Sequence, residues 1–88
     1  MPMLVTDPRK QDNPIVFVNA AFCKLTGYDA QEVMGKNCRF LQGPGTSQRD
    51  IDRMREALAR HEGIELDLLN YRKDGSPFWN RLVMNPVF

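Results

Sequence analysis

A thiol, a cation and an amide lie close together in residues 35–42, whose sequence is GKNCRFLQ. On a helix, Cys38 and Gln42 would lie on the same face, since side chains four residues apart are neighbours. Arg39 follows the thiol and could hold an anion, and a helix that begins after Gly35 would direct backbone N–H groups toward the same anion. The segment is therefore suited to hold a phosphate-bearing ligand against a reactive sulfur.

A second cation falls within the apolar stripe of the longest predicted helix. Ile51, Met54 and Leu58 follow the i, i+3, i+7 spacing of one helix face. Arg55 lies at i+4, inside that stripe, and a buried guanidinium must be paired with an anion. A local carboxylate, or a position at the rim of the buried face, would also satisfy it.

Two amides fall on the apolar faces of the last two predicted strands. Asn70 shares a face with Leu66 and Leu68, and Asn80 shares a face with Leu82. If the loop between these strands has an odd number of residues, the two amides can lie opposite each other on the core side. A heteroaromatic ring with an imide-like edge would satisfy both, since Asn offers a donor and an acceptor. Alternatively, each amide caps backbone near a strand end.

The elements that must position these residues follow from local patterns. We predict strands at residues 3–6, 14–18, 64–71 and 78–88, and helices at 20–26, after Asp29, within 35–42, and from a cap at Thr46 or Ser47 to about His61. Strands at both ends and helices between them predict an α+β fold, an antiparallel sheet with the helices grouped on one face.

Length and composition limit the class of protein. A chain of 88 residues is one domain, and a net charge of +1 without a run of Lys or Arg gives no reason to expect nucleic-acid binding. No apolar run approaches the roughly 20 residues of a membrane span, and no signal peptide is visible. Two cysteines fifteen apart do not form a disulfide framework, so we expect reduced thiols and a cytoplasmic location.

Two other classes of site use the same cysteine. A cysteine enzyme would need a base near Cys38, and the only histidine, His61, lies in the polar run Arg60–Glu62. A metal site built from Cys23, Cys38 and His61 lacks the usual spacing of metal ligands. We therefore do not expect an enzyme or a metal site.

The segment at 35–42, together with Arg55, Asn70 and Asn80, closely resembles the signature of LOV domains, the blue-light-sensing flavin branch of the PAS family. The resemblance covers the whole length, so residues 1–88 are expected to form a single LOV domain with the PAS fold. In that family a fifth strand follows and lies in the middle of the sheet. The chain stops at Phe88, before that strand, so we expect a domain truncated there. Its open sheet should lead to weak flavin retention, swapping or pairing with another chain, unless the sequence is part of a longer protein.

The resemblance also implies a ligand, flavin mononucleotide (FMN), and a role for each matching residue. Cys38 would be the photoreactive cysteine, and Arg39 and Arg55 would contact the phosphate. Asn37 and Gln42 would hydrogen-bond the flavin side chain and ring. Asn70 and Asn80 would contact the pyrimidine edge of the ring. The remaining residues would line the pocket: Thr6, Asn13, Leu41, Ile51, Met54, Leu58, Leu82 and Met84.

The function implied is that of a blue-light photoreceptor. In the dark, Cys38 should be a neutral thiol, because desolvation disfavours the thiolate. Blue light would join its sulfur to flavin carbon C4a, reversibly, and the change would pass to an output module in the same protein, such as a histidine kinase. We expect a homodimer through the sheet or flanking helices. The alternative is a PAS module that binds a ligand or dimerises without photochemistry; a fluorescent reporter is disfavoured, because such proteins usually lack the cysteine.

Overall fold

The helices and strands follow one another in the order that the sequence predicts, and the α+β class is confirmed. The computed structural model describes residues 1–84, apart from the side chain of Met84. Its elements, in chain order, are β1 (Leu4–Thr6), β2 (Ile15–Val18), α1 (Ala20–Thr26), α2 (Ala30–Val33), the 3₁₀ helix η1 (Cys38–Leu41), α3 (Gln48–Ala59), β3 (Ile64–Tyr71) and β4 (Pro77–Met84).

The chain divides into two compact units. The first unit contains Met1–Leu41 and Tyr71–Ser76, and the second contains Gln42–Asn70 and the segment that begins at Pro77. Among the described residues, β1 pairs with β2 and β3 pairs with β4, in two separate two-stranded sheets. Each unit has its own apolar core.

The first unit is organised by the antiparallel pair β1 and β2. Leu4 lies opposite Val18, and the register shifts between Val5 and Thr6, so that Thr6 lies opposite Ile15. The buried side chains of β2 pack with those of the following helices. This core consists of Ile15, Val18, Phe22, Val33 and Leu41.

Short helices in this unit begin and end where the sequence predicts. The Asn19 side chain accepts a 2.9 Å hydrogen bond from the backbone N–H of Phe22 at the start of α1. Gly27 ends α1 at a φ of 79°, a left-handed conformation that favours glycine. At α2, the Glu32 carboxylate accepts a 2.8 Å hydrogen bond from the N–H of Asp29, as the capping-box spacing predicts.

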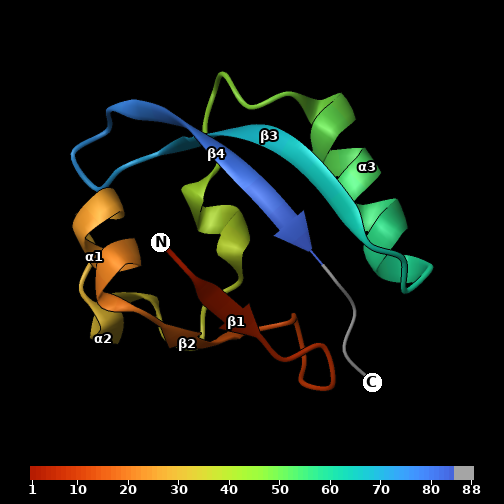
Figure 1. Ribbon diagram of the computed structural model, residues 1–88, viewed down its shortest axis with the longest axis horizontal. Helices are drawn as coiled ribbons and strands as arrows, with labels where there is room; N and C mark the ends of the chain where they lie inside the picture. Colours follow the sequence, from red (N-terminus) through yellow and green to blue (C-terminus); the bar gives the residue numbers. More distant parts are fainter. Residues whose placement is uncertain (85–88) are drawn as a thin grey trace. The chain divides into compact units, whose positions relative to one another are not determined.

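In the second unit, α3 packs along the hairpin of β3 and β4 (Figure 1). Ser47, not Thr46, caps α3, and the helix ends at Ala59, two residues before the predicted end at His61. Five residues, 72–76, join β3 to β4, so the loop is odd, as the alignment of the two asparagines requires. Strand β4 begins one residue earlier than predicted; the rest of the predicted strand, 85–88, lies outside the described residues.

Candidate functional site

Cys38 is the first residue of η1 and packs against the core of the first unit. Its side chain is half-buried, and that burial raises the pKa of the thiol above its ordinary value. A backbone hydrogen bond and the charge of Arg39 oppose the shift but do not cancel it. The thiol is therefore protonated at neutral pH, as we predicted.

The helix around Cys38 is shorter and tighter than predicted. Gly35 adopts a φ of 82°, and its N–H donates to the carbonyl of Ile15 at 2.9 Å, while Lys36 accepts from the N–H of Ile15 at 2.8 Å. These contacts hold residues 35 and 36 out of a helix, which begins only at Cys38 and ends at Leu41. The prediction of a helix after Gly35 is wrong.

The condition for aligning Cys38 with Gln42, one helix that contains both residues, is not met. Gln42 follows the end of η1 and is half-buried in the second unit. In a 3₁₀ helix, side chains three residues apart share a face, so Leu41 lies on the face of Cys38. Leu41 is buried, and both side chains belong to the same apolar cluster.

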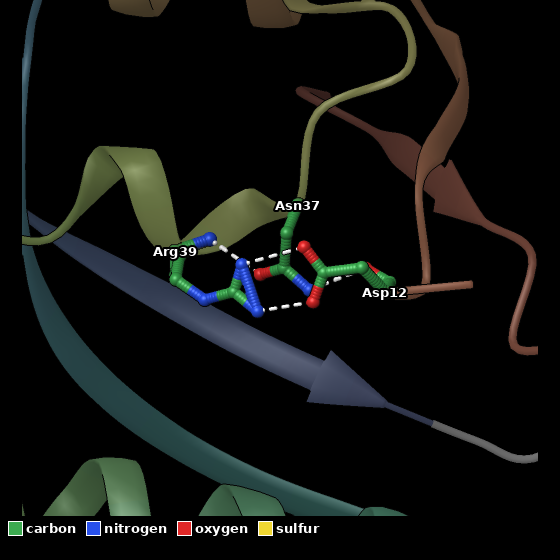
Figure 2. Close-up of polar contacts among 3 residues, drawn as sticks. All are labelled: Asp12, Asn37 and Arg39. Atoms are coloured by element: carbon green, nitrogen blue, oxygen red, sulfur yellow. Dashed lines mark hydrogen bonds and ion pairs between the residues drawn. The ribbon is translucent and has the colours of Figure 1, made fainter.

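Arg39 binds a carboxylate of the protein (Figure 2). Its Nη1 donates to Asp12 Oδ2 at 2.8 Å, and its Nη2 donates to Asp12 Oδ1. The Asn37 side chain hydrogen-bonds to the backbone of the same two residues. Its Nδ2 donates to the carbonyl of Asp12 at 2.7 Å, and its Oδ1 accepts from the N–H of Arg39 at 2.9 Å. A ligand of Arg39 or Asn37 must therefore share or replace these contacts.

Sequence reasoning missed Asp12, because nothing local connects it to Arg39. The two residues are 27 positions apart, and Asp12 lies in an irregular loop between β1 and β2. The only local signal was the turn sequence Asp12-Asn13-Pro14, which predicts a bend but no partner.

Asn13 and Thr6 lie on either side of the same loop and are both half-buried. Asn13 adopts a φ of 49°, in the left-handed region that asparagine tolerates better than most residues. Its side-chain oxygen is buried and accepts no hydrogen bond from any residue that the structure describes. Such an acceptor is costly to leave unpaired, so Asn13 suits a ligand that carries a hydrogen-bond donor.

Helix α3 turns a different face to the core than predicted. Ile51, Met54 and Ala57 are buried, at i, i+3 and i+6, whereas Leu58 is 42% exposed and Arg55 is exposed. The prediction that Arg55 and Leu58 belong to the buried stripe is wrong, because the stripe continues from Met54 to the small residue Ala57 and not to Leu58. Arg55 makes no ion pair with any described residue, so its charge is available to an anion.

Asn70 and Asn80 meet across the hairpin, as we predicted. Asn70 is 3% exposed, and its side-chain oxygen accepts a 2.9 Å hydrogen bond from Asn80 Nδ2. Asn70 Nδ2 donates to the carbonyl of Leu69 at 3.1 Å. Each amide has two N–H groups and one carbonyl, so the pair keeps the carbonyl of Asn80 and one N–H of each residue for a ligand.

Leu82 is half-buried and packs against the core of the second unit, which fits an apolar wall. Met84 is the last residue of β4, and its side chain lies outside the described part of the chain. Thr46, which is not the helix cap, donates a 2.6 Å hydrogen bond to the carbonyl of Leu69 and so fixes the strand beside Asn70.

Neither competing class of site gains support from the geometry. A raised thiol pKa disfavours the thiolate that a nucleophilic cysteine requires. Cys23 packs as an apolar residue in the core of the first unit, and His61 is exposed. No group of three His, Cys, Asp or Glu in residues 1–84 could hold a metal ion, and no helix there is long and apolar enough to cross a membrane.

The family described as the PAS domain matches residues 1–88. A blue-light-activated histidine kinase of Brucella anthropi is 58% identical over 87 residues, which are 99% of this chain and 18% of that protein. The corresponding kinase of Brucella canis is 56% identical over the same length. The chain thus spans about a fifth of the length of these relatives.

Solved structures agree with the sequence matches. The LOV domain of a blue-light-activated histidine kinase from Erythrobacter litoralis superimposes with a TM-score of 0.96 at 40% identity, over 99% of this chain and 80% of that one. The LOV domain of the blue-light photoreceptor Aureochrome1, in its light state, gives a TM-score of 0.86 at 46% identity, over 89% of this chain and 61% of that one.

Proposed function

This chain belongs to the LOV branch of the PAS domain family, and we propose that it senses blue light through a bound FMN that bonds reversibly to Cys38. The chain is a photosensory domain and carries out no turnover of a substrate. The observation that carries the proposal is the half-buried thiol of Cys38, whose pKa is raised by burial, because a PAS module without photochemistry has no need of it.

The polar groups of the chain fit a flavin. The unpaired oxygen of Asn13 suits a hydroxyl donor of the ribityl side chain. The remaining donors and acceptor of Asn70 and Asn80 suit the pyrimidine edge of the ring, which presents both kinds of group. The charge of Arg55 suits the phosphate, since a guanidinium binds phosphate oxygens through two N–H groups.

The other proposed contacts follow the family pattern. Arg39 is the second phosphate contact, and Asn37 and Gln42 bind the flavin side chain and ring. Apolar and small polar residues form the walls of the pocket: Thr6, Leu41, Ile51, Met54, Leu58, Leu82 and Met84. Most of the described walls are buried or half-buried; Leu58 is the exposed one.

Cys38 carries the photochemical step. The flavin supplies an absorption band in the blue and, on excitation, a reactive C4a=N5 double bond. Cys38 would supply the sulfur for C4a and the proton for N5, so that the S–H bond and the C4a=N5 π bond would be exchanged for one S–C bond and one N–H bond, without an external oxidant. Burial raises the pKa of Cys38, so the thiol would keep that proton available for transfer.

The signal passes, we propose, to an output domain in the same protein, a histidine kinase being the first candidate because the Brucella relatives carry that name. A homodimer through the sheet or the flanking helices would couple two such domains. Both cysteines are free, which agrees with a reducing compartment such as the cytoplasm.

An absorption spectrum of the purified protein tests the proposal. We expect a structured flavin band in the dark that bleaches under blue light and recovers thermally. A bound flavin that does not bleach would favour a PAS module that binds the ligand without photochemistry. A protein that binds no FMN when it is added would contradict the proposal outright.

A further inference from the structure

The guanidinium of Arg39 already holds an anion that belongs to the chain. Both of its terminal nitrogens bind the two carboxylate oxygens of Asp12, an end-on bidentate pair (Figure 2). That geometry occupies the edge of the guanidinium that would otherwise bind two phosphate oxygens. A carboxylate at this position also repels a phosphate that approaches the same cation.

We propose that Asp12 competes with the phosphate of the flavin for Arg39, and so limits the preference of the site for FMN over riboflavin. This inference rests on the proposed function, because it assumes that the site takes a flavin. It makes Asp12 a specificity-determining residue: the carboxylate acts only on a ligand that carries a phosphate.

The carboxylate can leave Arg39 without freeing the loop. The side chains of Arg39 and Asp12 are 52% and 57% exposed, so water can solvate each partner when they separate. The loop keeps a second attachment, because Asn37 Nδ2 binds the backbone carbonyl of Asp12 and not its carboxylate. Exchange of one anion for another at Arg39 therefore needs only a side-chain rotation.

The variant Asp12→Asn removes the charge and keeps the shape. Asp12 has a φ of 65°, and asparagine tolerates the left-handed region as well as aspartate does, so the loop should keep its conformation. Asp7→Asn is the matched control: Asp7 lies in the same loop and loses the same charge, but its carboxylate binds Arg9.

The experiment measures the dissociation constants of FMN and riboflavin for the wild-type protein and both variants. Exposed ion pairs contribute about 0.2–1 kcal/mol, so we expect Asp12→Asn to bind FMN about 1.4- to fivefold more tightly, with riboflavin unchanged. Asp7→Asn should change neither constant. The gain should shrink at high salt, where exposed charges are screened.

Three results would overturn the inference. Weaker FMN binding by Asp12→Asn would show that the carboxylate positions Arg39 for the phosphate. An equal gain for riboflavin would show that the carboxylate does not act on the phosphate, and unchanged constants for both flavins would show that it does not act at all. If the wild-type protein binds neither flavin, the proposed function fails first, and the inference fails with it.

Discussion

The side chain of Asn80 donates a 2.9 Å hydrogen bond to the side-chain carbonyl of Asn70, which is 3% exposed. Two amides on the apolar face of a hairpin thus satisfy each other in part, and they still leave a carbonyl and N–H groups unused. Such a pair stabilises the hairpin, and under the proposed function its unused groups bind the flavin. It follows that the loss of either amide should affect both properties.

Asn70→Ala should lower the free energy of unfolding by about 1–3 kcal/mol, because it leaves the Asn80 N–H group without its acceptor. FMN should also bind at least tenfold more weakly. Chemical denaturation and a flavin titration measure the two effects. Asp67→Ala is the control on the same strand, since its exposed contact with Arg81 at 3.4 Å should contribute less than 1 kcal/mol. Unchanged flavin affinity in Asn70→Ala would show that the amide pair does not contact the flavin.

Arg55→Ala should weaken FMN binding by about ten- to 150-fold and leave riboflavin binding unchanged, since a charged hydrogen bond contributes about 1.5–3 kcal/mol. Arg53→Ala on the same helix is the control, because Arg53 is also exposed but pairs with Asp50 at 3.7 Å. Isothermal titration with both flavins separates the phosphate contribution from the rest. An equal loss for the two flavins would contradict a phosphate contact.

The thiol of Cys38 should react slowly with alkylating reagents at pH 8, because burial raises its pKa and keeps the thiolate scarce. The same pKa shift determines how the free energy of unfolding depends on pH. Above the ordinary thiol pKa the unfolded chain releases the proton more readily than the folded one, so the free energy of unfolding should fall as pH rises through that range.

Cys38→Ala should remove that part of the pH dependence, which denaturation at a series of pH values can measure. A Cys38 that alkylates as fast as a free cysteine would show that the thiol is not desolvated. It would also reopen the hypothesis of a nucleophilic cysteine.

Strand periodicity placed both amides on the core faces of their strands, because the alternation of side chains is a local property. Their alignment depended on an odd loop, which the structure provides because β4 begins one residue earlier than predicted. The helix caps at Asn19 and Asp29 were also predictable from the local sequence. These signals lie within a few residues of the structure that they determine.

The errors arise where distant contacts decide the outcome. Bonds between Ile15 and residues 35 and 36 hold the backbone out of a helix, so η1 begins later than predicted. On α3, Ile51 and Met54 are compatible with a buried face that continues to Ala57 or to Leu58. The sequence favoured Leu58 because it is the larger apolar residue, but Ala57 is the buried one. The partner of Arg39 is 27 residues away and follows from the loop fold alone.

Blue illumination of Cys38→Ala tests whether Cys38 forms the bond to the flavin, with Cys23→Ala as the matched control, since Cys23 is the other free thiol of the same unit. We expect Cys38→Ala to keep its bound flavin and its fluorescence but to lose the reversible bleach of the blue absorption band. Cys23→Ala should bleach and recover like the wild-type protein. A bleach that persists in Cys38→Ala would contradict the account, because the bond to flavin would then not involve Cys38.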